Sequence, residues 1–554
     1  MNNKLKITFN DMSVSEFDIN TPVLEMAKFY QEKIINPIIG AKINNQVVDF
    51  NVKLNQDTTL NFFDINDLTG YKMYQAGLKF VMIVALREIY GSSAKVVFEH
   101  SIDKGIMCTI TNGKPFDEAM SEELKKKMTE IIEEDLPIQK INVTKRDAID
   151  FYNKVGEKEK AVNIQNLANQ LVIFYKLKDS CNYFYMDMPY STGVLAKFDI
   201  KYLEEGSFVL LFPSPRSNNE VPEYTHHQSI IDVFKKAKEW VKKMNVPYVS
   251  YFNQIVTEGK VEDFIRMNEI EMNNQLQETA KTILSKEKIK MILVAGPSSS
   301  GKTTTTKKLA MRLKAAGKKI LMISVDDYFK ERTETPRFEN GDYDFESLAA
   351  IDIDLFNTQL KELLDGKSVT LPTFDFKLGK KLYTDEEVSI DKDTILIVEG
   401  LHCLNEEITT SIAREVKYKI YLSPFTPLSA DRHNHLSTVD LRLIRRIVRD
   451  NRTRGWDVSQ TIKSWQNVRL GEERYIFPHI READEVLNTA LIYELGVLKV
   501  YAEPILFSVS ITSPYYEEAR RLINFLKSFF PISSEYVPND SILREFVGGS
   551  IYDE

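Results

Sequence analysis

Residues 296–303, with the sequence GPSSSGKT, have the types and spacing needed to bind a phosphate group. They match the pattern G-x-x-x-x-G-K-[ST] at every fixed position. An apolar run at 290–295 predicts a buried strand before them, and residues 304–316 predict a helix after them. Backbone N–H groups and the helix dipole then point at phosphate, while Lys302 adds a positive charge and Thr303 offers a hydroxyl to Mg²⁺. This segment therefore predicts a site for a nucleoside triphosphate.

Acidic residues follow two other predicted strands. Asp326 and Asp327 follow the run 319–325, and Glu399 ends the run 394–398. In open parallel sheets, ligands bind beyond the carboxyl ends of the strands, so Asp326 is placed to accept the proton of a substrate hydroxyl. Its alternative roles are a helix cap or a ligand of Mg²⁺-bound water. Glu399 is placed to hold Mg²⁺ through water, and its alternative role is a structural carboxylate.

Six arginines gather between residues 442 and 454. Three of them, Arg442, Arg446 and Arg449, have the spacing i, i+4, i+7 and share one face of a predicted helix. Planar guanidinium groups suit phosphate clamping, so we predict a lid that closes over the triphosphate. The alternative is a solvated basic face.

The composition is that of an ordinary globular protein. Its 554 residues are too many for one core, and about three or four domains are expected. A net charge of −8 argues weakly against broad binding to nucleic acid or membranes. Three distant cysteines predict neither a disulfide framework nor a Cys-based zinc site, which suits a reducing cytosol. The apolar runs are too short to span a bilayer and the first residues lack a signal core, so we expect a cytoplasmic protein without membrane attachment.

Secondary-structure patterns predict an α/β protein with five regions. Residues 1–66 predict a β-grasp domain, and residues 67–215 predict an α+β domain whose strands include 183–188 and 194–202. Residues 216–287 read as a helical connector with breaks at a proline and a glycine. Residues 288–500 alternate strands, predicted at 291–294, 319–325, 394–398 and 418–422, with helices, which predicts a parallel sheet flanked by helices on both faces. Residues 501–554 predict an extension that packs on this last domain.

Six pieces of residues 288–490 stand in the order found in one kinase family. They are GPSSSGKTT (296–304), SVDDYF (324–329), DYDFESL (342–348), LPTFDF (371–376), VEG (398–400) and RRIVRDNRTRG (445–455). This segment resembles the P-loop kinases of the uridine kinase and phosphoribulokinase family. The resemblance implies ATP and Mg²⁺ as cofactors, a carboxylate as the catalytic base and arginines in a lid.

The resemblance assigns these roles to individual residues. The expected catalytic residues are Asp326, Lys302 and Arg449. The expected ATP-binding residues are Gly296, Ser298, Ser299, Ser300, Gly301, Lys302, Thr303, Thr304, Arg446 and Arg454. The expected substrate-binding residues are Asp326, Phe374, Asp375 and Arg449, and the expected Mg²⁺ ligands are Thr303 and Glu399.

Three positions depart from the uridine kinase pattern. Phe374 stands where these kinases usually carry Tyr, and Gly379 stands where they place a His that contacts the base. Trp456 replaces a further Arg after the Arg-Gly of the lid. A phenyl ring still stacks on a base, but a site that does not pair the uracil edge cannot strongly demand it. The kinase class is therefore predicted more firmly than uridine as the acceptor.

The N-terminal regions resemble threonyl-tRNA synthetases. Residues 1–66 resemble the TGS domain of these enzymes. Residues 67–215 resemble their second, editing-type domain, especially at PYSTGVLAKFDI (189–200) and at the helix predicted over 73–90. RNA contact, regulation and scaffolding are the open roles for these regions.

The metal ligands of that editing-type domain are missing. In the synthetases it carries an H-x-x-x-H pair and a later Cys and His. Ala76, Phe80, Phe184 and Met188 align with these four positions, and none is a normal ligand of a hydrolytic metal. His100 has no partner at metal-binding spacing, so a structural role is predicted for it. The resemblance implies this fold without the editing chemistry.

We predict an ATP- and Mg²⁺-dependent kinase that phosphorylates a hydroxyl of a nucleoside, with the 5′-hydroxyl as the expected acceptor. One alternative is a kinase for another small hydroxyl compound, such as a sugar phosphate. Another is an RNA-binding regulator in which the P-loop domain acts as a nucleotide switch. That domain has no N-K-x-D motif to read guanine, and the net charge weakens the RNA alternative. Homo-oligomer formation stays open.

Overall fold

A five-stranded parallel sheet carries residues 296–303, the phosphate loop. The computed structural model describes residues 4–91, 93–102, 104–111, 116–338 and 341–552. The strand order is β15-β18-β14-β19-β20, and each neighbouring pair is parallel. The strands are β14 (Met291–Ala295), β15 (Lys319–Ser324), β18 (Thr394–Glu399), β19 (Lys417–Ser423) and β20 (Glu485–Asn488). The sequence predicts the first four, whereas β20 is too short to be recognised from its pattern.

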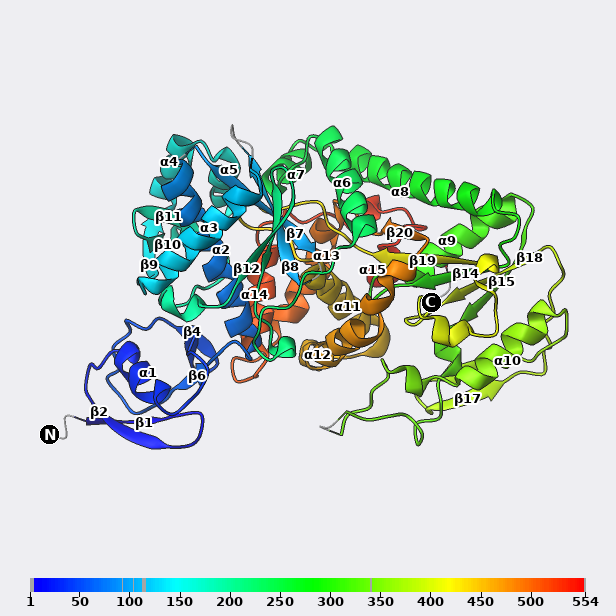
Figure 1. Cartoon of the computed structure of the whole chain (residues 1–554), viewed down its shortest axis with the longest axis horizontal. Helices are drawn as coiled ribbons and strands as arrows, with labels where there is room; N and C mark the ends of the chain where they lie inside the picture. Colours follow the sequence, from blue (N-terminus) through cyan, green and yellow to red (C-terminus); the bar gives the residue numbers. More distant parts are fainter. Residues whose placement is uncertain (1–3, 92, 103, 112–115, 339–340, 553–554) are drawn as a thin grey trace.

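Helices cover both faces of this sheet and build a separate core on each (Figure 1). On one face lie α8 (Val261–Leu284) and α9 (Lys302–Ala315). On the other face lie α6 (Gln228–Lys243) and α10 (Ile353–Leu364). All five residues of the central strand are buried, as expected for a parallel strand covered on both sides. The predicted parallel sheet flanked by helices is confirmed.

Residues 216–287, which the sequence predicts as a connector, are mostly helical in the structure. It contains α6, α7 (Val249–Thr257) and α8, which are separated near Pro247 and Gly259. Because α6 and α8 bury their apolar faces on the sheet, this region also forms part of the core of the phosphate-loop domain.

Residues 4–66 form a small unit of two three-stranded sheets and one helix. The sheet orders are β2-β1-β5 and β4-β3-β6, and the core includes Ile7, Met26 and Phe62. The sequence does not predict β2, because none of its residues is buried and it shows no apolar face. The elements are β1 (Lys4–Thr8), β2 (Val14–Asp18), α1 (Val23–Gln31), β3 (Gly40–Ile43), β4 (Gln46–Val48), β5 (Thr58–Thr59) and β6 (Asn61–Phe63).

The next region packs the long helix α2 (Leu68–Tyr90) against a four-stranded antiparallel sheet of order β12-β13-β8-β7. A second sheet has the order β11-β10-β9. The remaining elements are β7 (Lys95–Ile102), β8 (Gly105–Thr111), α3 (Glu118–Glu133), β9 (Gln139–Thr144), α4 (Lys145–Val155), α5 (Lys158–Asn166), β10 (Leu171–Leu177), β11 (Ser180–Tyr183), β12 (Asp199–Glu204) and β13 (Ser207–Leu211).

Two strands predicted in this region have the wrong extent. The strand predicted at 183–188 ends at Tyr183, and the strand predicted at 194–202 starts only at Asp199. Pro189 lacks the N–H that a strand needs for pairing, and Gly193–Leu195 form a 3-10 turn. The apolar side chains between these two strands therefore belong to a loop, not to a strand, although they are buried in the core.

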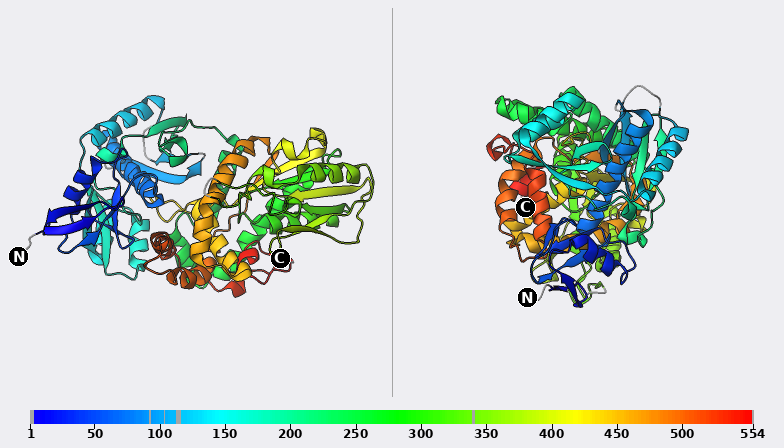
Figure 2. Two further views of the ribbon diagram at one scale, coloured as in Figure 1. Left: turned by 90° about the horizontal axis from the view of Figure 1, so that it is seen from below. Right: turned by 90° about the vertical axis from the view of Figure 1, so that its left-hand side faces the viewer.

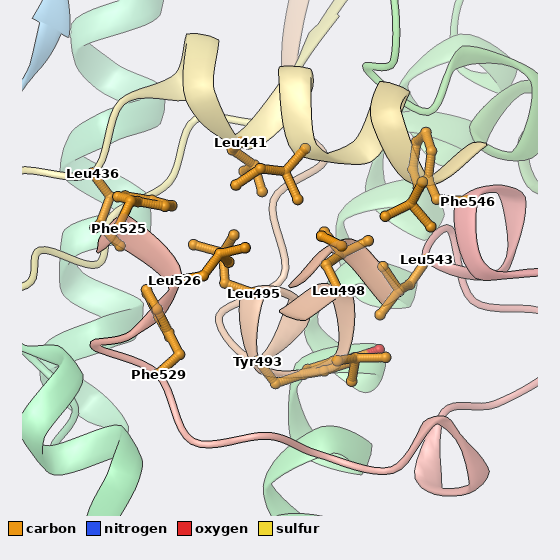
Figure 3. Packing of buried hydrophobic residues seen from close by; sticks show 14 of the residues in the cluster. Leu436, Leu441, Tyr493, Leu495, Leu498, Phe525, Leu526, Phe529, Leu543 and Phe546 are labelled. Atoms are coloured by element: carbon orange, nitrogen blue, oxygen red, sulfur yellow. The ribbon is translucent and has the colours of Figure 1, made fainter. Parts of the chain in front are cut away.

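The C-terminal extension, residues 501–552 of the described chain, packs on the phosphate-loop domain. Its helices α14 (Tyr516–Leu526) and α15 (Arg544–Val547) share one apolar core with α11 (Thr438–Arg454) and α13 (Glu494–Phe507). Figure 3 shows this core, in which Phe525 and Phe546 approach from the extension. The extension is thereby held against the helix that carries the arginine cluster.

The molecule is elongated. Figure 2 shows the small N-terminal unit and the five-stranded sheet at opposite ends, with helices of the C-terminal half between them. Within the described ranges, no helix is both long and apolar enough to cross a membrane.

Candidate active site

The phosphate loop joins β14 to α9 in a backbone shape that two glycines permit. A Cβ atom at Gly296 would lie 2.5 Å from the carbonyl oxygen of Leu422 on β19. Gly301 has φ +84° and stands at the N-cap of α9. The Lys302 Nζ donates to the Gly296 carbonyl at 2.9 Å, so the ammonium lies over the loop. The loop therefore presents the N-terminus of α9 and one ammonium group to a phosphate.

Two arginines of α11 donate hydrogen bonds to carbonyl oxygens of the phosphate loop. Arg442 Nε donates to the Ser298 carbonyl at 2.9 Å, and Arg445 Nη1 donates to the Ser299 carbonyl at 3.3 Å. Both side chains are buried, and each pairs with a buried carboxylate, Glu472 for Arg442 and Glu494 for Arg445. These two arginines hold the loop in shape and are not available to a ligand.

Three of the other four arginines of α11 converge on one buried carboxylate. Arg446 Nε lies 3.2 Å, Arg449 Nη2 2.9 Å and Arg454 Nη1 3.6 Å from the oxygens of Asp450. Arg446 Nη1 also donates to Ser298 Oγ at 2.9 Å. We name Arg446, Arg449 and Arg454 the lid arginines. Asp450, which the sequence does not single out, sets their positions beside the loop.

Strand register brings Glu399 to the phosphate loop. Glu399 pairs with Val294 of β14 and with Ser324 of β15, so it stands at the carboxyl edge of the sheet. The Thr303 hydroxyl donates to its two carboxylate oxygens at 3.2 and 3.3 Å. Burial raises the pKa of Glu399 to about 7, although Lys302 opposes the shift.

These two side chains fit a magnesium ion. A hydroxyl and a carboxylate are hard oxygen ligands of the kind that Mg²⁺ prefers, and they face each other next to the phosphate loop. Their contact also means that the buried carboxylate has one neutral partner where a cation would satisfy it better.

The structure separates the roles of the two neighbouring aspartates. Asp327 Oδ1 accepts the backbone N–H of Phe374 at 3.1 Å, so this carboxylate links the 3-10 turn after β15 to the strand Pro372–Asp375. The Asp326 residue is exposed to solvent, just beyond the carboxyl end of β15. Desolvation by the surrounding protein raises the pKa of Asp326, while Lys302 and Arg454 lower it. Asp326 is thus the free carboxylate that lies in the field of both the loop lysine and a lid arginine.

The residues expected to bind the acceptor lie on a hairpin of β16 (Pro372–Asp375) and β17 (Lys380–Tyr383). Phe374 is only 5% exposed and packs on Phe329 and Phe376 with ring centroids 5.6 and 5.1 Å apart. Asp375 Oδ1 accepts two backbone N–H groups of the turn that follows it. Phe376, at 54% exposed, presents the open aromatic face in this cluster, and the role of Phe374 as a stacking surface stays a prediction.

Backbone geometry explains one departure from the kinase pattern. Gly379 has φ +68°, and a Cβ atom there would lie 2.9 Å from Cβ and Nε of Arg332. The Arg332 N–H donates to the Gly379 carbonyl at 3.0 Å. A histidine at this position would be strained and would displace Arg332. The other departure, Trp456, lies 5.7 Å from the guanidinium of Arg454.

Glu346 also belongs to the site, although the sequence assigns it no role. Glu346 packs closely on α12 (Val458–Tyr475). A Cβ atom added at Gly471 would lie 2.2 Å from the Cβ of Glu346. Burial and the neighbouring Glu472 raise its pKa to about 7, while Arg446 opposes them. The only sequence signal for Glu346 is the motif DYDFESL (342–348) that contains it, and residue spacing alone does not show that its side chain lies near Arg446.

The four positions aligned with editing-type metal ligands lie in an apolar core. Ala76, Phe80, Phe184 and Met188 are all buried there, with the two phenyl rings 5.5 Å apart. Within the part of the chain that the structure describes, no cluster of His, Cys, Asp and Glu side chains has the arrangement of a metal site. His100 stacks on Phe234, and burial lowers its pKa to about 3, as expected for a structural histidine.

One family model and several kinases are similar to part of this chain. The model of the Phosphoribulokinase / Uridine kinase family matches residues 291–491. A uridine kinase of Bacillus pumilus (strain SAFR-032) is 31% identical over 198 residues, which are 36% of this chain and 85% of that protein. A solved structure described as a possible uridine kinase from Bacillus stearothermophilus has a TM-score of 0.28 and 19% identity, and the match covers 39% of this chain and all of that one.

The N-terminal region matches a different class of protein. A threonine–tRNA ligase of Desulforamulus reducens is 28% identical over 169 residues, which are 30% of this chain. The match spans 26% of the ligase, so most of that protein has no counterpart in it.

Proposed function

Because the chain belongs, through residues 291–491, to the phosphoribulokinase and uridine kinase family, we propose that it transfers the γ-phosphoryl group of ATP to a hydroxyl of a nucleoside. The observation that carries the proposal is the convergence of one free carboxylate, Asp326, with the phosphate loop and a lid arginine at one sheet edge. Phosphoryl transfer needs mainly positioning and charge stabilisation, which these groups supply.

The chain's own residues divide the work. Lys302 and the N–H groups at the start of α9 hold the terminal phosphates, and Asp326 accepts the proton of the acceptor hydroxyl. The lid arginines offset the charge that develops on the transferred group. Thr303 and Glu399 would hold Mg²⁺, which would neutralise phosphate oxygens when bound.

We propose the 5′-hydroxyl of a nucleoside as the acceptor. The aromatic cluster around Phe376 supports a planar ring as part of the substrate, and the known uridine kinases among the relatives support a nucleoside. The family also includes phosphoribulokinase, so a kinase of a sugar phosphate is the second candidate. Gly379 offers no side chain to hydrogen-bond a base, which favours a broad choice of nucleoside.

For the N-terminal regions we propose the TGS-like and editing-type folds with a scaffolding role. The apolar core at the four former ligand positions supports the loss of editing chemistry. RNA contact is the alternative, and a gel shift with total tRNA tests it, since tight binding that weakens with salt would favour it. The three cysteines are free thiols, which agrees with the cytoplasm as the proposed location.

A substrate panel tests the proposed function. The full chain is incubated with γ-labelled ATP, Mg²⁺ and single nucleosides, sugar phosphates or glycerate, and labelled products are separated. We expect label in a nucleoside monophosphate. Label only in a sugar phosphate or in glycerate would replace the nucleoside by the second candidate, and no label in any compound would overturn the kinase function.

A further inference from the structure

The C-terminal extension reaches the phosphate loop through one carboxylate. Glu545 Oε2 accepts the Thr304 hydroxyl at 2.9 Å and the Thr304 backbone N–H at 3.4 Å. Thr304 is in the first turn of α9, where free N–H groups and the helix dipole attract anions. A carboxylate of the chain itself therefore occupies one of the groups that a phosphate loop offers to nucleotide.

The packing around Glu545 fixes this carboxylate in place. The Arg452 side chain of α11 donates to the carbonyl oxygens of Glu545 at 3.0 Å and Phe546 at 3.2 Å. Ile542 lies so close to the loop that a Cβ atom at Gly301 would be 2.6 Å from its Cγ2. Phe546 is fully buried in the core that Figure 3 shows. The contact is thus made by a packed segment and not by a free chain end.

One ion pair and one hydrogen bond, made by residues that precede Glu545 in the extension, add to this anchoring. Lys308 of α9 pairs with Asp540 at 3.0 Å, and Ser541 donates to the buried Glu269 of α8 at 2.5 Å. Both helices of this sheet face are therefore tied to the segment that carries Glu545. The first two turns of α9 are therefore bound to the extension, at Thr304 and at Lys308.

The negative charge of Glu545 opposes nucleotide binding at the phosphate loop. Glu545 adds a second carboxylate beside the loop, and its charge acts on Glu399, whose ionisation it opposes. A triphosphate that approaches Thr304 meets a like charge that already holds the N–H and the hydroxyl. Nucleotide must displace the Glu545 side chain or move the segment that carries it.

We propose that Glu545 lowers the affinity of the phosphate loop for nucleotide by occupying the amide and hydroxyl of Thr304, where a phosphate oxygen of bound nucleotide belongs. The inference rests on the proposed function only in that the loop binds a nucleoside triphosphate. The bound form requires the Thr304 amide to exchange its carboxylate partner for phosphate, and no covalent bond changes.

Direct binding of MgATP, measured by calorimetry without any acceptor, tests this proposal. Glu545→Gln and Glu545→Ala should bind MgATP about tenfold more tightly than the wild-type chain, since a charge-assisted contact no longer competes. The matched control is Glu535→Gln, an exposed carboxylate of the same extension, which should leave the dissociation constant unchanged. Equal affinities of folded wild-type, Glu545→Gln and Glu545→Ala chains would overturn the proposal.

Hydrogen exchange on the wild-type chain decides the matter where a variant fails to fold. MgATP should speed exchange of amides in residues 541–549, because the segment loses its contact with Thr304. Slower exchange there would show that the segment clamps nucleotide, which contradicts the proposal. Failure of the proposed kinase function and failure of the proposed role of Glu545 give different results. No MgATP binding by the wild-type chain or any variant would contradict the kinase function. Equal MgATP affinity of the wild-type chain and the Glu545 variants would contradict only the role of Glu545.

Discussion

Replacing Arg521 by methionine tests how the extension is joined to the rest of the chain. Arg521 of α14 donates to both oxygens of Asp440 on α11 at 2.7 and 2.8 Å, and to both oxygens of Glu518 at 2.7 and 2.8 Å. Lys72 of α2 completes the group, 3.0 Å from Glu518. The side chains of Arg521, Asp440 and Glu518 are 10, 8 and 11% exposed, so solvent cannot replace the lost cation.

The magnitude follows from charge and burial. The wild-type group holds two cations and two carboxylates, whereas Arg521→Met leaves two carboxylates that share one cation, Lys72, 3.0 Å from Glu518 and 3.6 Å from Asp440. Removing one partner of a buried ion pair costs about 3–5 kcal/mol of unfolding free energy. We expect a loss of this size at pH 7.5, measured by urea denaturation with tryptophan fluorescence. Arg520→Met, an exposed neighbour on the same helix, should change stability by less than about 0.5 kcal/mol.

The pH dependence of this loss gives a sharper test. Burial alone would raise the pKa of Glu518 and Asp440, but Arg521 and Lys72 outweigh it and hold both pKa values below their usual range. Their ionisation therefore stabilises the wild-type fold above pH about 4, and this contribution is lost as the pH falls through the lowered values. Without Arg521 burial dominates, the carboxyls protonate on mild acidification, and the destabilisation should shrink between pH 7.5 and pH 5.

A charge-matched double variant separates electrostatics from packing. Asp440→Asn combined with Arg521→Met restores neutrality of the buried group, so it should recover part of the lost stability at pH 7.5. A loss below about 1 kcal/mol at pH 7.5, or an equal loss at pH 7.5 and pH 5, would refute the electrostatic reasoning.

Two further variants probe the site itself. Glu399→Gln should raise the half-saturating Mg²⁺ concentration for activity about 10- to 100-fold, because a carboxylate that supports the metal is removed. The exposed control Glu407→Gln should leave this concentration unchanged. Equal half-saturating Mg²⁺ concentrations for Glu399→Gln and the wild-type chain would count against the assigned role. Asp450→Asn should lower kcat/KM about tenfold, because the lid arginines lose the carboxylate that positions them. Since the Asp450 side chain is fully buried, the variant should also lower the melting temperature, and kcat/KM is measured well below it. A kcat/KM within twofold of wild type would show that Asp450 does not position them.

Much of the candidate site follows from local sequence. The phosphate loop, Asp326 and Glu399 stand at fixed places after strands, and parallel strands bring their carboxyl ends to one edge. Local patterns also predict the four longer strands and the long helices, since these carry strong apolar periodicity.

Other features depend on contacts between distant parts of the chain. Arg442 and Arg445 look like phosphate ligands in sequence, yet their partners Glu472 and Glu494 lie 30 and 49 residues away and bury them. Glu545 meets Thr304 across 241 residues, so no spacing rule reveals it. Phe374 is apolar and lies on the strand β16, and only packing decides whether its ring is exposed or covered. These cases share one cause, which is that burial is set by tertiary structure.

The most direct test of the central claim is phosphoryl transfer by Asp326→Asn. The variant keeps the size and the hydrogen-bonding oxygen of the side chain but cannot accept a proton from the acceptor hydroxyl. The account predicts MgATP binding within about threefold of wild type and transfer reduced by about 10²- to 10⁴-fold, while the exposed control Asp385→Asn transfers normally. Transfer by Asp326→Asn at the wild-type rate would contradict the account.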